Sequence, residues 1–221
     1  MSTTLTLSSP HAVRDLHTFV ERARAIHDGS ARLIASDGVL AVYVGVFFPR
    51  GLLDRTPTVL GLRVVTLAEP LSLDRVVPLE ALSHRLNAAS TEDRSDFSVP
   101  SESPSIQWAA ITPPRDGWRR RLGVSQAQLQ EAAARGVEEV TKNLPDQAGE
   151  AVLQKVRAEV WGTPIEGKKY LPRGAGFAAE ALGLLTERSL GVHTVDNWVR
   201  VTSKHGYVLV KTPLAASEED E

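Results

Sequence analysis

The chain contains no cysteine, and this absence removes several kinds of chemistry at once. Without thiols there is no disulfide framework, no thiolate metal ligand and no cysteine nucleophile, which suits a reducing compartment. No apolar stretch approaches the roughly 20 residues that span a bilayer. The N-terminal MSTTLTLSSPHAVRD also lacks the basic start and apolar run of a secretory signal. We therefore expect a cytoplasmic protein that does not contact a membrane.

An excess of charge of either sign is also missing. The 25 basic and 27 acidic residues give a formal net charge of −2, so no long-range field draws the whole protein onto nucleic acid or an anionic membrane. A nucleic-acid role therefore needs a local basic patch. Hydrophobic residues make up 42% of the 221 residues and charged residues 24%, which is typical of a chain that folds.

Catalytic and metal-binding motifs are missing as well. The six histidines form no i, i+4 helical pair and no H-E-x-x-H motif, and neither G-x-S-x-G nor G-x-x-x-x-G-K-[ST] occurs. His193 and Asp196 are the nearest approach to an acid–base pair, and such an isolated pair is typical of a loop cap or a surface. We predict no metal site and no cofactor. The missing motifs also make an enzyme less favoured than a non-catalytic protein.

The first half of the chain shows alternating helix and strand signals. Ser9 and Pro10 suit the N-cap and the first position of a helix whose apolar residues recur at helical spacing. Asp37-Gly38 between two β-rich runs predicts a hairpin. The predicted elements are a helix over 10–28, strands over 31–35, 39–48 and 58–67, and a short helix over 79–86.

The second half carries stronger helix signals. Ser125 and Gln128 match the capping box, and apolar residues keep helical spacing behind them as far as Leu144. The predicted elements are a strand over 106–112, a basic turn over 115–121, helices over 125–144, 146–162 and 174–185, and a terminal hairpin of 198–202 with 207–211.

These elements come in groups rather than in strict alternation, which predicts an α+β fold with two lobes. Residues 1–90 form a helix/three-strand/helix lobe, and residues 91–104 form a polar linker rich in Ser, Asp, Glu and Pro. Residues 105–214 form a mainly helical lobe with one strand, closed by the hairpin, and residues 215–221 form an acidic tail. The alternative is a single merged domain in which 106–112 joins the first sheet.

A glycine-rich segment is the first candidate site. Gly174 to Ala179 has the G-x-G-x-x-A pattern of a dinucleotide-binding turn, but the preceding residues 166–173 are not an apolar strand. A narrower hypothesis is that free backbone amides and nearby cations hold an anion. The alternative is close packing by small residues. The candidate anion-binding residues are Lys168, Lys169, Arg173, Gly174 and Gly176.

Two basic features form the second candidate site. Residues 122–129 resemble the turn and start of a recognition helix, although prolines interrupt the helix that should precede them. Guanidinium groups pair with phosphates and tryptophan stacks on bases. The alternative is an ordinary solvated face. The candidate nucleic-acid-binding residues are Trp118, Arg119, Arg120, Arg121, Lys204 and His205.

All four tryptophans follow residue 107, which indicates an aromatic core or a partner surface in the second half. The order TPPRDGW, VWGTP, PRGAGFAAEALGLL and a closing W-V-R-V hairpin resembles a functionally unassigned family of actinobacterial proteins. This resemblance covers about half of the chain. It implies a bacterial cytoplasmic protein and supplies no activity or site residues.

Three classes of function stay open. The sequence favours a non-catalytic protein-interaction or structural module, with a protein partner or self-association, because tryptophans are concentrated and a catalytic grouping is missing. The alternatives are a nucleic-acid-binding protein that uses the basic turn and hairpin, and a small anionic-ligand-binding protein or enzyme.

Overall fold

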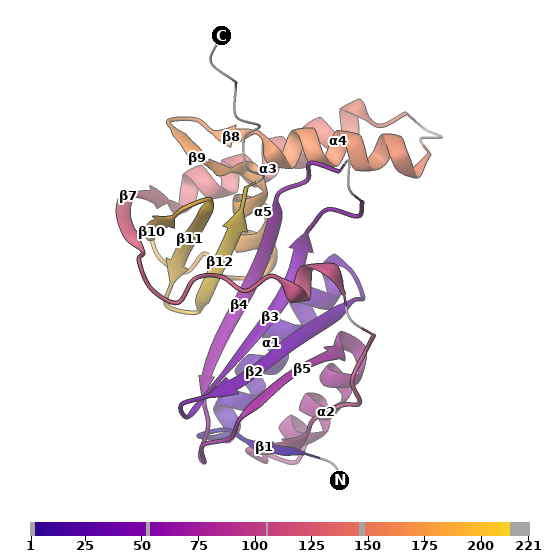
Figure 1. The fold of residues 1–221 in the computed structure, drawn as a ribbon, viewed down its shortest axis with the longest axis vertical. Helices are drawn as coiled ribbons and strands as arrows, with labels where there is room; N and C mark the ends of the chain where they lie inside the picture. Colours follow the sequence, from indigo (N-terminus) through magenta and orange to yellow (C-terminus); the bar gives the residue numbers. More distant parts are fainter. Residues whose placement is uncertain (1–2, 52–53, 105, 146–148, 213–221) are drawn as a thin grey trace.

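A computed structural model describes residues 3–51, 54–104, 106–145 and 149–212. The elements are β1 (Thr4–Thr6), α1 (Pro10–Ile26), β2 (Ser30–Ser36), β3 (Val39–Phe47), β4 (Thr58–Thr66), β5 (Leu73–Pro78), α2 (Leu79–Thr91), β6 (Asp96–Ser98), the 3-10 helix η1 (Gln107–Ala110), β7 (Arg119–Ser125), α3 (Gln126–Asn143), α4 (Glu150–Gly162), β8 (Pro164–Ile165), β9 (Lys168–Pro172), α5 (Arg173–Ala181), β10 (Ser189–Val195), β11 (Trp198–Ser203) and β12 (Gly206–Lys211). Eight strands form one sheet in the order β5-β2-β3-β4-β12-β11-β10-β7 (Figure 1).

The two halves of the chain meet at the centre of this sheet. Strand β4 pairs with β12 in antiparallel register, which sets Leu60 opposite Leu209 and Gly61 opposite Val208. On each side of this seam the chain runs through a helix and three successive strands, α1-β2-β3-β4 on one side and α5-β10-β11-β12 on the other. The sheet is therefore continuous across the halves.

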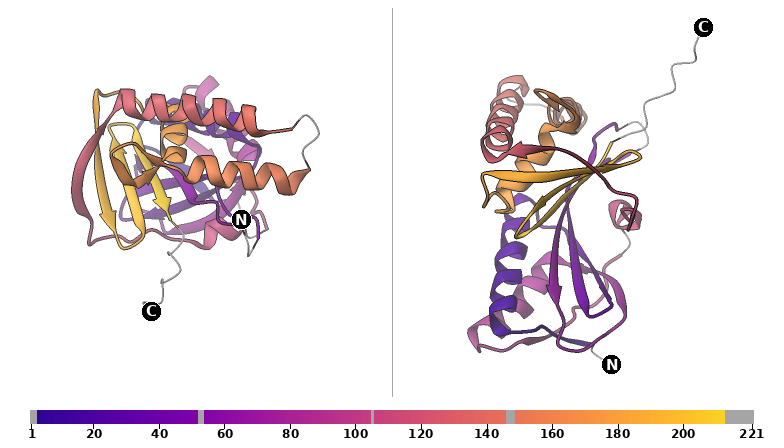
Figure 2. Two further views of the ribbon diagram at one scale, coloured as in Figure 1. Left: turned by 90° about the horizontal axis from the view of Figure 1, so that it is seen from above. Right: turned by 90° about the vertical axis from the view of Figure 1, so that its left-hand side faces the viewer.

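Both faces of the sheet are covered. The helices pack on one face, and the segment that contains η1 crosses the other (Figure 2). Alternation along β12 divides its side chains between two cores, with Val208 and Val210 under the helices and Leu209 beneath the η1 segment. Trp108 of η1 is 2% exposed and anchors this second core. Among the described residues, no helix is both long and apolar enough to cross a membrane.

Several local predictions are confirmed. Helix α1 begins at Pro10 with the Ser9 hydroxyl accepting from the amide of Ala12, and α3 begins with the complete Ser125–Gln128 capping box. Asp37 and Gly38 both have positive φ, as a two-residue hairpin turn of type I′ requires. These features depend only on neighbouring residues.

The predicted division into an N-terminal sheet lobe and a mainly helical C-terminal lobe is wrong. Strands β7, β10, β11 and β12 of the second half supply half of the eight-stranded sheet. The sequence pattern does not predict β7, because this edge strand is exposed from Arg119 to Gly123 and lacks the apolar alternation of a half-buried strand. The fold is one mixed domain rather than two lobes of different class.

The strand predicted over 106–112 is also wrong. Its apolar residues form η1, and they are apolar because Trp108 and Ala109 cover the second core rather than because the segment pairs in a sheet. Segment 91–104, predicted as a linker, holds the end of α2 and strand β6, which pairs with β1. The boundaries 1–90 and 105–214 stay a prediction, and the acidic tail 215–221 lies outside the described residues.

The continuous sheet predicts that the two halves unfold together. Leu16 of α1 is fully buried, so Leu16→Ala should cost about 2–5 kcal/mol of stability. The urea midpoints measured by circular dichroism and by tryptophan fluorescence should fall by the same amount. This is a test of coupling because every tryptophan follows residue 107, whereas the substitution is in the first half. Leu129→Ala in α3 is the matched variant in the second half. A fluorescence transition that stays in place in Leu16→Ala would show that the halves are independent.

Candidate functional site

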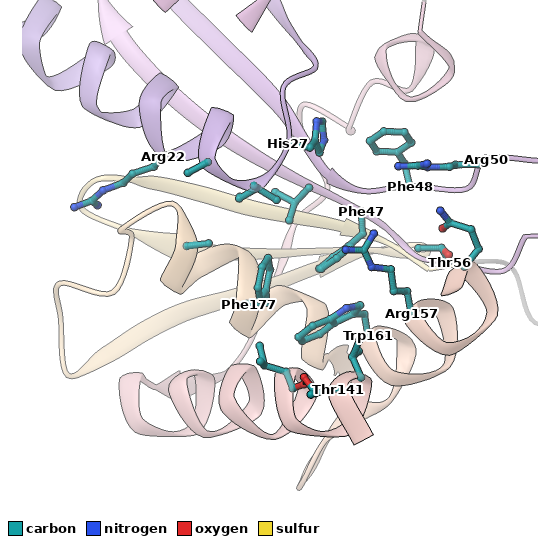
Figure 3. Close-up of a pocket in the computed structure, with 17 residues that line it drawn as sticks. Arg22, His27, Phe47, Phe48, Arg50, Thr56, Thr141, Arg157, Trp161 and Phe177 are labelled. Atoms are coloured by element: carbon teal, nitrogen blue, oxygen red, sulfur yellow. The ribbon is translucent and has the colours of Figure 1, made fainter. Parts of the chain in front are cut away.

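A cavity of about 500 Å³ lies where the two halves meet on the helical side of the sheet. Helix α1 and the end of β3 line one wall, and α3, α4 and α5 line the others (Figure 3). Neither half makes this cavity alone. It is larger than the pocket of about 290 Å³ on the opposite face of the sheet.

Three aromatic rings from three elements form the floor of the cavity. Phe47 of β3 stacks on Trp161 of α4 with 5.2 Å between ring centroids and 20° between planes. Phe177 of α5 lies 4.9 Å from Trp161 and 5.3 Å from Phe47, tilted to both. Aromatic clusters of this kind combine a large apolar area with defined geometry. The floor therefore suits an apolar or planar group.

A glycine on α3 makes room for this floor. A Cβ atom on Gly136 would lie 2.2 Å from the Trp161 ring, which no side chain tolerates without movement. A Cβ atom on Gly174 of α5 would make a tight contact of 3.2 Å with Phe47. The position of Trp161 thus depends on close approach of three helices.

Positive charge gathers around the aromatic floor. Arg22, Arg50 and Arg157 line the cavity, and among the described residues no aspartate or glutamate does. Arg50 pairs with Glu150 at 3.1 Å, and Arg22 donates to the carbonyl of Leu182 at 3.4 Å. Arg157 has neither a hydrogen bond nor an ion pair with another described residue, and it extends beside Phe47 and Trp161 (Figure 3). A guanidinium group without a protein partner is free to pair with an anionic group.

The helix period explains how α4 builds the wall. Gln154, Arg157 and Trp161 are spaced i, i+3 and i+7, so all three lie on one face. Only the C-terminal end of α4 is buried, at Val160 and Trp161. Further along the α3–α4 pair, Val137 is 48% exposed and Val152 45% exposed. The cavity therefore opens beside exposed apolar side chains.

Sequence reasoning missed this cavity. The sequence marks Trp161 only as an aromatic of a core or interface, and it gives no comparable indication for Phe47, Arg157 and Phe177. The available signal was Arg157 four residues before Trp161 on one helix, which places a guanidinium beside an aromatic ring. The wall formed by α1 and the end of β3 lies more than 100 positions before Arg157 in the chain, which no local pattern reveals.

The residues predicted to bind an anion lie elsewhere and do not converge. Gly174 and Gly176 are buried in α5, where a Cβ on Gly176 would lie 2.5 Å from the carbonyl oxygen of Leu129. Arg173 pairs with Glu139 of α3. Lys168 and Lys169 belong to the small β8–β9 hairpin. Gly176 serves the close packing of α3 on α5, and Gly174 packs against Phe47 and the carbonyl of Trp161. Anion binding here stays a prediction.

The residues predicted to bind nucleic acid are divided between faces of the sheet. Arg120 lies opposite His193 on the η1 side, whereas Arg121 donates to Thr194 Oγ1 at 2.8 Å. Trp118 covers Arg200, with 4.5 Å from Cζ to the ring centroid. Arg119 begins β7 opposite Thr194. Lys204 and His205 lie in the β11–β12 turn, where Lys204 pairs with Glu187 at 3.5 Å and the His205 carbonyl accepts from Arg63. The six residues do not form one continuous surface.

Two other features bear on the chemistry of the molecule. Within the described parts of the chain, no group of three or more His, Cys, Asp or Glu side chains is placed to hold a metal. Burial lowers the pKa of His193, and the charges of Arg200 and Arg120 lower it further. His193 therefore stays neutral to lower pH than an exposed histidine.

The packing at Gly136 generates the first prediction for this site. Gly136→Ala should displace Trp161 and destabilise the protein by about 1–3 kcal/mol, more than the roughly 1 kcal/mol that alanine adds to a helix. Thermal unfolding and near-ultraviolet circular dichroism measure the two effects. Gly162→Ala is the control, because its new Cβ meets nothing closer than 3.8 Å. A Gly136→Ala variant as stable as the control would contradict the packing argument.

The lowered pKa of His193 leads to a second prediction, on the pH dependence of stability. Between the folded pKa and the usual value of 6.5, the unfolded chain binds more protons than the folded one, so stability falls as the pH drops through this window. His193→Gln should remove that part of the pH dependence. Urea midpoints at several pH values and an NMR titration of the histidine rings test it. A folded-state pKa at or above 6.5 would be the opposite result.

Comparisons with known proteins match each half of the chain to a separate family. Residues 1–109 match a domain of unknown function, DUF8010, and residues 113–215 match a second one, DUF8185. The first match ends within η1 and the second begins before β7, so each covers one half of the sheet. No curated protein sequence matches the chain.

Solved structures reveal the fold more clearly. A DNA polymerase sliding clamp from Caulobacter crescentus is 13% identical with a TM-score of 0.54, and the match covers 99% of this chain and 67% of the clamp chain. The DNA polymerase III β subunit from Pseudomonas aeruginosa is 13% identical with a TM-score of 0.52, covering 97% of this chain and 65% of that one. The chain thus spans about two thirds of these clamp chains. At this identity the likeness establishes a sliding-clamp-like fold.

Proposed function

We propose that this protein is a non-catalytic protein-interaction module, and that a segment of a partner protein enters the cavity between α1, α3, α4 and α5. The segment presents an acidic group to Arg157 and an apolar side chain to Phe47, Trp161 and Phe177. The single observation that carries the proposal is an aromatic floor beside Arg157, in a cavity where the described part of the chain supplies neither a partner for this arginine nor an acidic lining residue.

The surroundings of the cavity favour a protein segment over a small molecule. Val137 lines the cavity and is nearly half exposed, and Val152 is exposed on the adjacent helix. Exposed apolar side chains beside an aromatic and arginine-bearing pocket are typical of protein interfaces, where Trp and Arg carry much of the binding energy. A peptide would cover these valines, whereas a ligand confined to the cavity would leave them in water.

The sliding-clamp-like fold is compatible with this role, but the helices of this chain do not offer a duplex-binding surface. Helices α1, α2, α3 and α5 taken together carry as many acidic as basic side chains. Affinity for a duplex depends on an excess of cations facing phosphates. The helical side of the sheet therefore favours a protein partner over double-stranded DNA.

Photo-crosslinking in the native cell tests this proposal. A benzoylphenylalanine at Val137 should crosslink to a defined protein, and the product should disappear when Arg157→Glu is added. Binding should weaken by about 2 kcal/mol or more when a charge-assisted contact becomes a repulsion, which lowers the affinity more than ten-fold. Crosslink yield on a denaturing gel and mass spectrometry of the product give the measurement.

Two matched variants serve as controls. Arg85→Glu changes the charge equally on the exposed side of α2, away from the cavity, and should leave the product intact. A benzoylphenylalanine at Val64, which is 40% exposed on β4, should not yield the same product. A product that persists in Arg157→Glu, or that forms equally from Val64, would contradict the proposal. A small molecule that copurifies in the cavity would replace it.

A further inference from the structure

The face of the sheet opposite the helices carries a row of basic residues. Arg120 of β7, His193 of β10 and Arg200 of β11 lie directly opposite one another on three adjacent strands. Adjacent strands are about 4.8 Å apart, so the row spans about 10 Å. None of the three side chains forms an ion pair with another described residue. The charges of Arg120 and Arg200 are therefore available to a bound anion.

Two atoms in this row lack partners. Arg200 Nε and His193 Nδ1 are buried, and neither has a hydrogen-bond partner among the described residues. Buried polar atoms in native structures are nearly always bonded to protein, water or ligand. An acceptor brought by a ligand would satisfy the donor on Arg200. The row is therefore polar, cationic and incompletely bonded.

A pocket of about 290 Å³ adjoins Arg200. Tyr43, Trp118 and Tyr207 contribute aromatic rings to its lining, and Arg115 joins Arg200 as a second cation. The Arg200 guanidinium lies 4.5 Å from the centre of the Trp118 ring and 5.8 Å from that of Tyr207. Asp37 is the acidic residue of the lining. The pocket thus combines aromatic walls, two guanidinium groups and one carboxylate.

This combination matches the two parts of a nucleotide. Bases stack on aromatic side chains irrespective of sequence, and guanidinium groups bind phosphate through paired hydrogen bonds. A carboxylate accepts from exocyclic amino groups or from ribose hydroxyls. We infer that this face binds a nucleotide unit, with its base among Tyr43, Trp118 and Tyr207 and its phosphate against Arg115 and Arg200.

A nucleotide unit comes either as a free mononucleotide or as part of a single strand. The basic row continues beyond Trp118 to His193 and Arg120, where a second phosphate of a strand would lie. A duplex does not fit, because its bases are already paired and stacked. This site is on the opposite face of the sheet from the cavity of the proposed function, and it does not depend on that function.

Equilibrium binding to the full chain tests the inference. The probes are AMP, UMP and inorganic phosphate by calorimetry, and fluorescein-labelled 12-nucleotide single strands and duplexes by anisotropy at 50 and 200 mM salt. Arg200→Gln and Arg115→Gln should each weaken nucleotide and single-strand binding about ten-fold or more, because each removes a charge-assisted phosphate contact. Arg115 is exposed, so its variant tests the site even if Arg200→Gln does not fold.

Arg120→Gln separates the two sources of the nucleotide. If the ligand is a single strand, this variant should weaken strand binding, reduce the salt slope by about 0.7 and leave mononucleotide binding unchanged. If the ligand is a free nucleotide, strands bind no tighter than AMP and Arg120→Gln has no effect. Arg85→Gln, with the same loss of charge elsewhere, should stay within about two-fold of the wild type.

Three results would overturn the inference. The first is no measurable binding of any nucleotide or single strand at 50 mM salt. The second is equal affinity of Arg115→Gln, Arg200→Gln and Arg85→Gln. The third is inorganic phosphate or duplex binding as tightly as nucleotide or single strand, because the aromatic pocket would then contribute nothing.

Discussion

The antiparallel pairing of β4 with β12 is the interaction on which the rest of the structure depends. It sets Leu60 beside Leu209, and it brings residues from the two halves of the chain into one sheet. Side chains alternate along both strands, so the same pairing contributes Val59 and Val210 to the core under the helices and Leu60 and Leu209 to the core under η1. A shift of one residue would exchange these faces and break both cores.

The two candidate sites follow from this seam. On the helical face, joining the halves brings β3 and α1 against α3, α4 and α5, and the space left between them is the arginine- and aromatic-lined cavity. On the other face, the same joining sets Tyr43 of the first half near Tyr207 and Arg200 of the second. The two sites lie on opposite faces of the sheet, so a protein segment and a nucleotide unit would not compete for the same surface.

Both edges of the sheet have features that discourage the addition of another strand. Strand β7 has a register irregularity opposite Gly191 and three consecutive exposed arginines, and both features discourage pairing with another strand. At the other edge, the amide of Ser103 donates to the carbonyl of Val76 at 2.8 Å, which occupies part of β5. Interaction with a partner is therefore better served by the cavity and the exposed valines than by the addition of a strand.

The sequence by itself determined the local elements: α1 with its Ser9 cap, the Asp37-Gly38 hairpin, the capping box of α3 and the β11–β12 hairpin. Each depends on residues only a few positions apart in the chain, so their types and spacing are enough to predict it. Only the tertiary structure decided that residues 60 and 209 pair, that η1 covers a face instead of joining the sheet, and that Phe47, Arg157 and Phe177 surround one cavity. It also decided that Arg120, His193 and Arg200 form a row. These contacts join segments far apart in the chain, and the burial and pairing energy that selects them belongs to the whole sheet rather than to any local pattern.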